Sequence, residues 1–311
     1  MKPFPHPKYL EFLEQEAISI LRDTHGLHSS REKINSVCVL FSGGKDSVVL
    51  SELVRRAFLP CEIPFQFLSI DTGHNFPEVN DFIAQRMAEI NGDILIGRVQ
   101  DDIDLGSVVE KKEYFSSRNQ LQSFVLNKMV REKSIKALIG GARRDEEKAR
   151  SKERLFSKRT AGGGWVPESQ EPELNFHLGV DLNLTDHVRV FPISNWTEED
   201  VWHYIGWRNL AVPSIYFSHV RDCLIYKNQI WPFSKYLLYP QGDCSIEIKK
   251  LSVRCRTVGD MNCTGLQISK ATTIDEVIDE IRNSTISERG LRLDDQFSET
   301  AMEDRKKEGY F

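Results

Sequence analysis

The chain has 311 residues, of which 40% are hydrophobic and 28% are charged, and its net charge is −5. This length and hydrophobic content suffice for one large domain, or for one domain with an appendage. The slight acidic excess argues against a dedicated nucleic-acid binder, which usually carries a large basic excess.

The sequence shows neither a secretion signal nor a membrane-spanning segment. The first residues show no basic segment leading into a long apolar run, and no stretch approaches the roughly 20 apolar residues of a membrane span. The six cysteines contain no CxxC pair, which favours reduced thiols over a disulfide framework. We therefore expect a cytoplasmic protein that binds neither membranes nor nucleic acid.

The first predicted elements are a helix, a strand and a second helix. Apolar side chains recur at helical spacing over residues 8–24, and Gly26 ends this helix. The continuous apolar run at residues 37–41 is rich in β-branched residues and predicts a buried parallel strand. The loop 42–47 follows, and a second helical pattern begins at Val48.

Strands and helices then continue to alternate. Further strands are predicted at residues 65–70, 93–96, 137–140 and 188–192, and further helices at residues 76–90 and 120–133. This alternation predicts an α/β fold with a doubly wound, mainly parallel sheet. Such sheets bind ligands at the carboxyl ends of their strands, which is where the loop 42–47 should lie.

The remaining sequence contains two helix starts and a less regular region. Thr197 with Asp200, and Thr273 with Glu276, each predict a helix that begins with a capping box. Beyond about residue 212 the pattern loosens, which predicts an irregular C-terminal extension with a charged tail that only a ligand or partner orders. The predicted units are an N-terminal helical segment (1–30), a nucleotide-binding α/β domain (31–211) and the extension (212–311).

The loop 42–47, with the sequence SGGKDS, has the chemistry of a phosphate site. Gly43 and Gly44 can adopt backbone angles closed to other residues and let a ligand approach the main chain. The helix that follows directs unpaired N–H groups and the positive end of its dipole at the ligand. Polar side chains of the loop add hydroxyl groups and a cation suited to pyrophosphate: Ser42, Lys45 and Ser47.

The spacing of this loop distinguishes between two classes of ATP-binding loop. It differs from the Walker pattern GxxxxGK[ST], which disfavours a phosphoryl-transfer ATPase. It resembles instead the PP-loop of the ATP pyrophosphatases. That resemblance implies that the β- and γ-phosphates bind here, that a nucleophile attacks the α-phosphorus, and that pyrophosphate leaves. The loop alone leaves the acceptor open, because similar loops occur in enzymes that amidate small molecules or modify tRNA.

Four further stretches narrow the family: residues 71–73 (DTG), 140–154 (GGARRDEEKARSKER), 190–197 (VFPISNWT) and 306–311 (KKEGYF). With the loop, they resemble the small, ATP-binding subunit of bacterial heterodimeric sulfate adenylyltransferase. The resemblance implies AMP transfer from ATP to sulfate, giving adenylyl sulfate and pyrophosphate in the first step of sulfate assimilation. It also implies a GTPase large subunit as partner, whose GTP hydrolysis drives the reaction. Some family members carry a bulky apolar residue where this chain has Gly43.

Residues 140–154 also predict an anion site by their own chemistry. Two glycines end a strand, so Arg143 and Arg144 are expected at the ligand edge of the sheet. The planar fork of arginine suits a tetrahedral oxyanion, which lysine binds only as a point charge. Lys148 and Arg150 extend the basic side. Acidic residues interleave, however, so much of the run also fits a solvated helix with salt bridges.

Two carboxylates are candidate Mg²⁺ ligands. Asp71 follows a strand, where it could coordinate Mg²⁺ through water, hold the ribose of ATP, or cap the next turn. Asp46 lies beside the expected phosphates and could bind the metal or cap the helix. His74 is close enough in sequence to reach this edge, although a lone loop histidine more often has no role.

The mechanism implied by the resemblance needs no covalent intermediate. Sulfate is already ionised, so no general base is required. Catalysis should come from orienting sulfate in line with the α-phosphorus and from stabilising charge on the departing pyrophosphate. Mg²⁺, Lys45, Arg143 and Arg144 are expected to supply that stabilisation.

Two alternatives stay open on the sequence. One is a PP-loop enzyme that adenylates another acceptor, a tRNA base or a small molecule, and it would need a nucleic-acid surface or a metal cluster. The cysteines that could hold a cluster lack the tight pair typical of metal sites: Cys223, Cys244, Cys255 and Cys263. The other alternative is a non-catalytic paralogue that only docks the GTPase, which the complete loop and the arginines disfavour.

Overall fold

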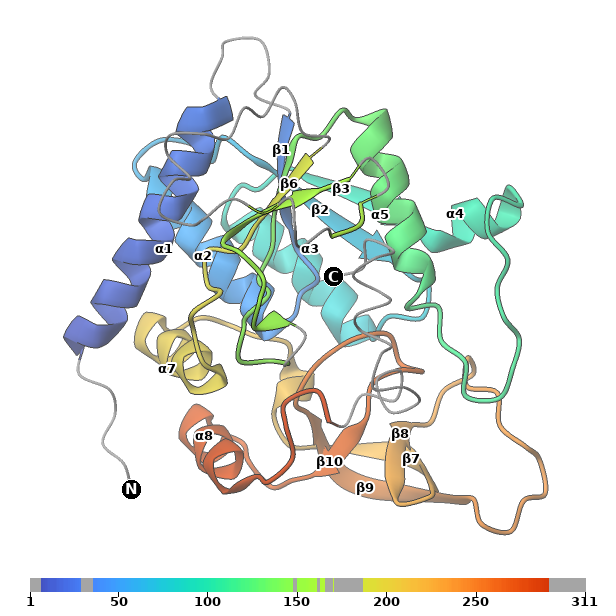
Figure 1. Ribbon diagram of the computed structural model, residues 1–311. Helices are drawn as coiled ribbons and strands as arrows, with labels where there is room; N and C mark the ends of the chain where they lie inside the picture. Colours follow the sequence, from blue (N-terminus) through green and yellow to red (C-terminus); the bar gives the residue numbers. More distant parts are fainter. Residues whose placement is uncertain are drawn as a thin grey trace.

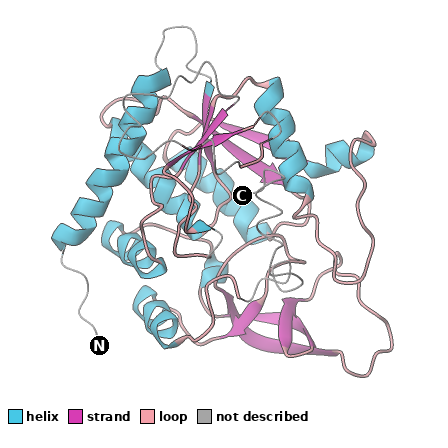
Figure 2. Cartoon of the chain, in the orientation of Figure 1, coloured by secondary structure: helices cyan, strands magenta, loops and turns pink. Residues whose placement is uncertain are grey.

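The computed structural model describes residues 7–28, 36–147, 150–160, 163–165, 170 and 187–290. Its strands form two separate groups, a six-stranded sheet and a four-stranded sheet (Figure 2). In Figure 1 the larger sheet lies among the helices, and the smaller sheet lies below it. None of the described helices combines the length and apolar character needed to cross a membrane.

The larger sheet confirms the predicted mainly parallel α/β fold. Its strands in spatial order are β3 (Ile94–Arg98), β2 (Gln66–Asp71), β1 (Val37–Leu40), β4 (Ala137–Ile139), β6 (His187–Val190) and β5 (Phe156–Arg159). Five of them pair in parallel, and β5 adds an antiparallel edge. The sequence analysis did not predict β5, which follows the charged run directly.

Helices cover both faces of this sheet because successive strand residues point to opposite sides. Val37 and Val39 of β1 pack into the main core, whereas Cys38 packs with Leu126 and Val130 on the other face. The helices are α1 (Pro7–His28), α2 (Lys45–Phe58), α3 (Pro77–Glu89), α4 (Val99–Asp104) and α5 (Leu121–Glu132). All except α4 match a predicted helix to within a few residues.

The C-terminal part is more regular than predicted. It begins with α7 (Glu198–Arg208) and a 3-10 turn, η5 (Ser214–Tyr216). Four antiparallel strands then form the second sheet, in the order β10 (Leu266–Ile268), β9 (Glu247–Cys255), β7 (His219–Tyr226) and β8 (Gln229–Pro232). The expectation of an irregular extension was therefore wrong where these four strands lie, whereas residues 233–246 between β8 and β9 are irregular.

Both predicted capping boxes are present. Thr197 caps α7 with Asp200, and Thr273 caps α8 (Ile274–Asn283) with Glu276. The two helices are joined by Arg282 of α8, whose Nε donates to Glu199 Oε2 of α7 at 2.9 Å.

The strand order creates a switch point beside β1. The chain runs from β1 to β2 and β3 on one side, and the later strands β4 and β6 lie on the other. The carboxyl ends of β1 and β4 therefore open onto the crevice where doubly wound sheets bind ligands. The loop 42–47 follows β1, and the loop 140–147 follows β4.

Candidate functional site

The segment 42–47 follows β1 as predicted, but α2 already begins at Lys45, so its loop part is shorter than the sequence suggested. Gly43 has φ +73°, in the left-handed region that favours glycine. A Cβ atom at this position would lie 2.8 Å from Val79 Cγ1 and 3.0 Å from Ile83 Cγ1, both on α3. In this chain glycine is thus favoured by its backbone angle and by its close approach to a neighbouring helix.

Gly44 does not use the conformational freedom that the sequence suggested. Its φ of −72° and ψ of 157° are extended angles open to any residue. A Cβ atom here would lie 3.3 Å from Ser42 Oγ and 3.4 Å from the Tyr216 hydroxyl. The Gly44 N–H donates to Ser42 Oγ, and Ser47 Oγ donates to the Gly44 carbonyl at 2.8 Å. The loop therefore closes on itself through its own polar groups.

Lys45 is the first residue of α2, and its side chain is buried. Its main-chain N–H donates to the Tyr216 hydroxyl at 2.9 Å, and its Nζ lies 2.9 Å from Asp46 Oδ2. Nζ also forms an ion pair with Glu288. Burial alone would lower the pKa of Lys45, but Asp46 and Glu288 raise it above its ordinary value. Lys45 is therefore a buried cation.

Arg143 shares these carboxylates. Its Nε donates to Asp46 Oδ1 at 2.7 Å, and its Nη2 donates to Glu288. Burial opposes the charge, but Glu288 and Asp46 hold the pKa of Arg143 well above its ordinary value. The structure thus brings Lys45 and Arg143 together, as the sequence predicted.

Arg144 does not join them. Its guanidinium donates to the Glu153 carbonyl at 2.8 and 3.1 Å and to Asn195 Oδ1 at 2.6 Å. Its main-chain N–H donates to the Ser194 carbonyl. These acceptors fasten the loop after β4 to the segment after β6. The structure therefore places Arg144 in loop packing, away from the Lys45 cluster to which the sequence analysis assigned it.

The other predicted basic residues of the run 140–154 have different outcomes. Arg150 lines the same cavity as Lys45, and its Nη1 lies 2.9 Å from Glu146 Oε2. Lys148 lies outside the described residues. No α-helix occurs among residues 140–147 and 150–155, which form turns and loops instead of a salt-bridged helix.

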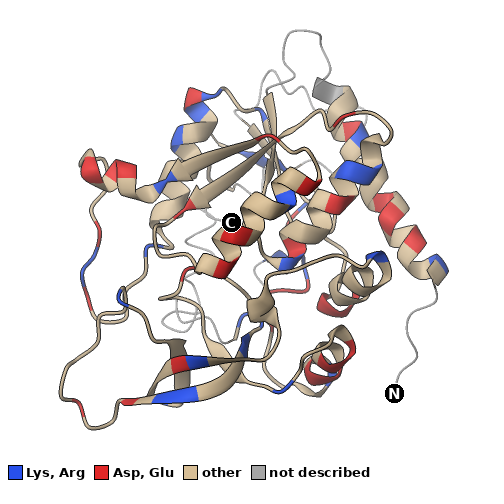
Figure 3. Ribbon diagram, turned by 180° about the vertical axis from the view of Figure 1, so that it is seen from behind, with Lys and Arg blue, Asp and Glu red and all other residues tan. Residues whose placement is uncertain are grey.

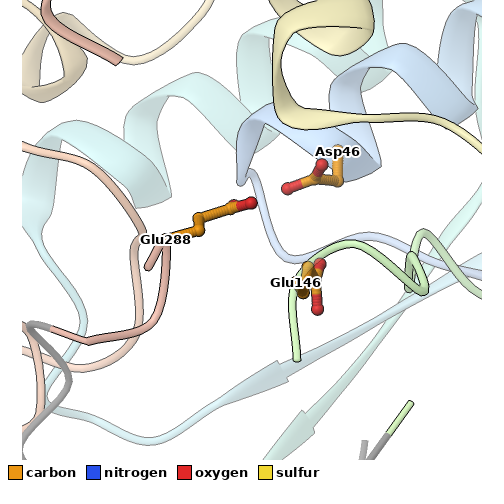
Figure 4. A group of neighbouring side chains, drawn as sticks. All are labelled: Asp46, Glu146 and Glu288. Carbon is orange, nitrogen blue, oxygen red and sulfur yellow. The ribbon is translucent and has the colours of Figure 1, made fainter. Parts of the chain in front are cut away.

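Three carboxylates meet at the polar end of the site (Figure 4). Asp46 comes from α2, Glu146 from the loop after β4, and Glu288 from the segment after α8. One oxygen of each lies within 4.8 Å of the others. In Figure 4 Asp46 and Glu288 point toward each other, with Glu146 beside them. Carboxylate oxygens are ligands that Mg²⁺ accepts in proteins, so this group fits a metal ion by its chemistry.

A cavity of about 260 Å³ surrounds this cluster. Its polar end is formed by Lys45, Asp46, Glu146, Arg150 and Glu288. Apolar side chains from β1, β2 and α5 form another part of its wall: Leu40, Leu68, Ile70 and Leu126. The amino end of α5 adds amide and hydroxyl groups: Asn119, Gln122 and Ser123. The cavity thus combines a charged end with an apolar wall.

Asp71 and His74 lie beside the cavity but outside its lining. Asp71 Oδ1 accepts from the Gly73 N–H at 2.8 Å and from Asn75 Nδ2 at 3.3 Å. Of the roles considered for Asp71, this geometry shows the cap of the turn. His74 is buried, and its ring stacks on Tyr236 with centroids 4.2 Å apart. Burial, and secondarily Arg118, lower the pKa of His74 to about 4.

Sequence reasoning missed two residues that contact Lys45, namely Tyr216 and Glu288. Both come from beyond the parallel sheet, and no motif at residue 216 or 288 pointed to the loop.

The sequence also gave no sign of the ion pair between Arg256 and Glu198, which holds the segment that carries Glu288. Arg256 Nη2 lies 2.8 Å from Glu198 Oε2, and Arg256 Nη1 donates to the Ile286 carbonyl at 2.7 Å. Burial and the nearby Glu288 raise the pKa of Glu198.

All six cysteines are free thiols, as predicted. Burial raises the pKa of Cys38 and Cys223 to about 11 and that of Cys255 to about 12. Such thiols stay protonated at neutral pH. Within the described ranges, the group that could hold a metal ion consists of carboxylates and includes no cysteine.

Comparison with known proteins identifies the family of this chain. Residues 36–266 match the phosphoadenosine phosphosulfate reductase domain. The chain is also 46% identical over 305 residues to sulfate adenylyltransferase subunit 2 of Mycolicibacterium gilvum, with 97% of this chain and 94% of that one covered. The chain belongs to the sulfate adenylyltransferase subunit 2 family. The member from Mycobacterium tuberculosis is 43% identical over the same share of both chains.

Membership of the sulfate adenylyltransferase subunit 2 family confirms the resemblance drawn from residues 140–154 and the predicted enzyme class, an adenylyltransferase. Solved structures are more distant. FMN adenylyltransferase of Candida glabrata, with FMN and an ATP analogue, is 16% identical at a TM-score of 0.47, over 67% of this chain and 61% of that one.

Proposed function

We propose that this chain transfers AMP from ATP to sulfate, giving adenylyl sulfate and pyrophosphate. One observation carries the proposal: Lys45 and Arg143, both buried, converge on a single anionic group at the polar end of the cavity. Two converging cations in a buried site are the donors that a phosphate or sulfate oxygen requires. The names of the family members support sulfate as the acceptor.

The cavity supports ATP as the second substrate. The amino end of α2 and the loop 42–47 suit the β- and γ-phosphates, because helix amino ends and glycine-rich loops favour anions. The wall formed by Leu68, Ile70 and Leu126 suits the adenine base, which needs an apolar contact surface. ATP would then lie with its α-phosphate near the carboxyl ends of β1 and β4.

The proposed reaction exchanges one bond to phosphorus for another. A sulfate oxygen forms a bond to the α-phosphorus, and the bond from that phosphorus to the bridging oxygen of the β-phosphate breaks. Pyrophosphate leaves with the electron pair of the broken bond. Lys45 and Arg143 orient the phosphates and stabilise the charge that develops on the leaving group. No protein base is needed, because sulfate carries no proton at neutral pH.

A Mg²⁺ ion fits this site through Asp46 and Glu146, whose oxygens belong to the group of carboxylates in Figure 4. Asp71 fits less well, because it lies outside the lining of the cavity and outside this group of carboxylates. When bound, the ion would neutralise phosphate charge. We therefore propose Asp46, rather than Asp71, as the metal ligand among the two carboxylates that the sequence suggested.

A partner subunit also belongs to this proposal. Relatives are named as subunit 2, and the sequence resemblance implies that the other subunit is a GTPase whose GTP hydrolysis drives the adenylation. The division of the chain at residues 30 and 211, and a cytoplasmic location, stay predictions of the same kind.

The test is sulfate-dependent pyrophosphate release from ATP and Mg²⁺, measured with and without the GTPase subunit and GTP. We expect release to depend on sulfate and to increase when the partner turns over GTP. Lys45→Ala should lose most of this activity while keeping the fold. Release that never depends on sulfate would overturn the acceptor, and unchanged release by Lys45→Ala would overturn the role of the loop.

A further inference from the structure

Glu288 occupies the position in which the proposed function puts an oxyanion. Its side chain is only 4% exposed, and its carboxylate accepts from Lys45 Nζ and from Arg143 Nη2. These ammonium and guanidinium groups are the donors that phosphate and sulfate oxygens use in proteins. A substrate oxyanion and the Glu288 carboxylate therefore compete for the same two cations.

The two cations already face carboxylates on several sides. Arg143 Nε lies 2.7 Å from Asp46 Oδ1, and Arg143 Nη1 lies 3.5 Å from Asp145 Oδ2. Lys45 Nζ lies 2.9 Å from Asp46 Oδ2. An anion added to this arrangement would meet a cluster that is already rich in negative charge. Like charges repel strongly where water is excluded, so one carboxylate must leave before a phosphate enters.

Glu288 is the carboxylate best placed to leave. Asp46 belongs to the first turn of α2, and Glu146 is paired with Arg150 at 2.9 Å. Glu288 instead lies in a turn beyond the end of α8. Nearby Ile286 is half exposed. Displacing Glu288 thus breaks no helix and no strand.

Arg256 gives this segment a fixed anchor. Its guanidinium donates to Ser284 Oγ at 2.8 Å and to the Ile286 carbonyl at 2.7 Å. The same guanidinium is paired with Glu198 at the start of α7. The segment is therefore held two residues before Glu288, and directly after it Arg289 Nε lies 3.6 Å from Glu147 Oε2. Displacement of Glu288 is thus a local movement between these two contacts.

We propose that Glu288 is an internal anion that closes the site in the absence of substrate, and that the phosphate groups of ATP displace it. This inference rests on the proposed function, because it requires a phosphate site at Lys45 and Arg143. Glu288 thereby controls access. Together with Asp46 it neutralises two buried cations while the site is empty, and it makes binding of the substrate anion an exchange of one anion for another.

Calorimetric titration of the full chain with inorganic pyrophosphate and with ATP tests this, each with and without Mg²⁺. Glu288→Gln removes the competing charge while keeping the shape of the side chain. The matched control is Glu280→Gln, because Glu280 of α8 pairs with Arg254 of β9, outside the cavity. We expect Glu288→Gln to bind both probes about tenfold more tightly than the unmodified chain. Glu280→Gln should leave both affinities unchanged.

A second variant guards against loss of folding. Glu288→Asp keeps the charge but cannot reach both cations as well, so we expect pyrophosphate affinity between those of the unmodified chain and Glu288→Gln. If Glu288→Gln does not fold, tighter binding of pyrophosphate by Glu288→Asp than by the unmodified chain is sufficient to support the displacement. Thermal unfolding should show that pyrophosphate stabilises Glu288→Gln more than it stabilises the unmodified chain.

The outcomes separate this inference from the proposed function. If the unmodified chain binds ATP and both Glu288 variants bind it equally or more weakly, the displacement is wrong and the ATP site stands. Weakening that occurs only with Mg²⁺ would make Glu288 a metal ligand and would also overturn the displacement. If neither the unmodified chain nor any variant binds ATP or pyrophosphate, the phosphate site itself is wrong and both proposals fall.

Discussion

Arg143 and Arg144 are neighbours in sequence but have different surroundings, which makes them a matched pair. Arg143 is paired with Asp46 and Glu288, whereas Arg144 donates to the Glu153 carbonyl and to Asn195. Arg143→Lys cannot reproduce the fork, so we expect a fall in turnover on the order of 100-fold. Arg144→Lys should keep turnover within about threefold and lower the free energy of unfolding by about 1 kcal/mol.

Steady-state pyrophosphate release and urea unfolding measure these two effects. A similar fall in turnover for both variants would show that Arg144 also acts in the site, as the sequence first suggested.

Gly43 can be compared with Gly106, because both have φ near +70°. A Cβ atom at Gly43 would lie 2.8 Å from Val79 Cγ1, whereas a Cβ atom at Gly106 would meet nothing within 4 Å. Gly106→Ala should therefore cost about 1 kcal/mol of unfolding free energy, from backbone strain alone. Gly43→Ala should cost about 2 kcal/mol more, because strain and overlap add.

Urea unfolding gives both values. Val79→Ala in the Gly43→Ala background should recover part of the loss by making room for the new methyl group. Equal costs at the two glycines would show that the contact with α3 is unimportant.

Parts of the site could be predicted because their residues lie in local motifs. Lys45 follows a buried strand and opens a helix, and Arg143 follows the two glycines after β4. Both therefore had to reach the ligand edge of the sheet. Tyr216 and Glu288 could not be found in this way, because they reach Lys45 only through the tertiary fold. Local spacing also could not separate Arg143 from Arg144.

At the scale of elements, Tyr216 links η5 to the start of α2. Its hydroxyl accepts the Lys45 N–H, and its removal would leave the loop to be ordered by the nucleotide. We expect Tyr216→Phe to raise KM for ATP about fivefold, with kcat within about twofold, and to cost about 1 kcal/mol of stability. Steady-state kinetics and urea unfolding check these values.

Tyr204→Phe is the matched control. Tyr204 is buried and its hydroxyl donates to Glu14 at 2.7 Å, on the side of α7 that faces α1. This variant should lose at least as much stability and leave KM unchanged. A rise in KM for both variants would mean that general loosening, and not the contact with Lys45, is responsible.

The two sheets differ in how far the sequence revealed them. Strands of the parallel sheet are short apolar runs, such as residues 37–40, and these are recognisable without a partner. In the second sheet the first four residues of β9 are exposed, so its apolar pattern is weak. The turn between β7 and β8 has positive φ at Lys227 and Asn228. This turn contains no glycine, so the usual signal of a hairpin was missing.

At the scale of the molecule, His74 joins the parallel sheet to the C-terminal part. Its ring stacks on Tyr236, and its carbonyl accepts from the Met261 N–H at 2.9 Å. Its pKa is lowered to about 4, whereas a histidine in an unfolded chain titrates near 6.5. Between these values the unfolded chain binds more protons, so acid favours unfolding. We expect His74 to remove about 2 kcal/mol of stability between pH 7 and pH 5.

Urea unfolding at pH 7 and pH 5 measures this loss, with His74→Gln as the comparison. The variant should show a smaller fall in stability over the same range. His187, whose pKa burial lowers to about 3, should contribute to the fall in both proteins. An identical fall in both would show that His74 is not kept neutral by the fold.

Charge is mixed over the molecule as a whole. Seen from behind in Figure 3, both acidic and basic residues occur over the described helices and strands. Four acidic residues lie on α8: Asp275, Glu276, Asp279 and Glu280. That nucleic acid is not a partner stays a prediction from the sequence.

The cavity is built from residues as far apart in the chain as Ser42 and Arg289, which has a consequence for synthesis on the ribosome. The segments that carry Lys45 and Arg143 emerge well before Glu288. A nascent chain at that stage therefore carries the two cations and Asp46, but not yet Glu288. The closure of the site by Glu288, as proposed above, therefore becomes possible only late in synthesis.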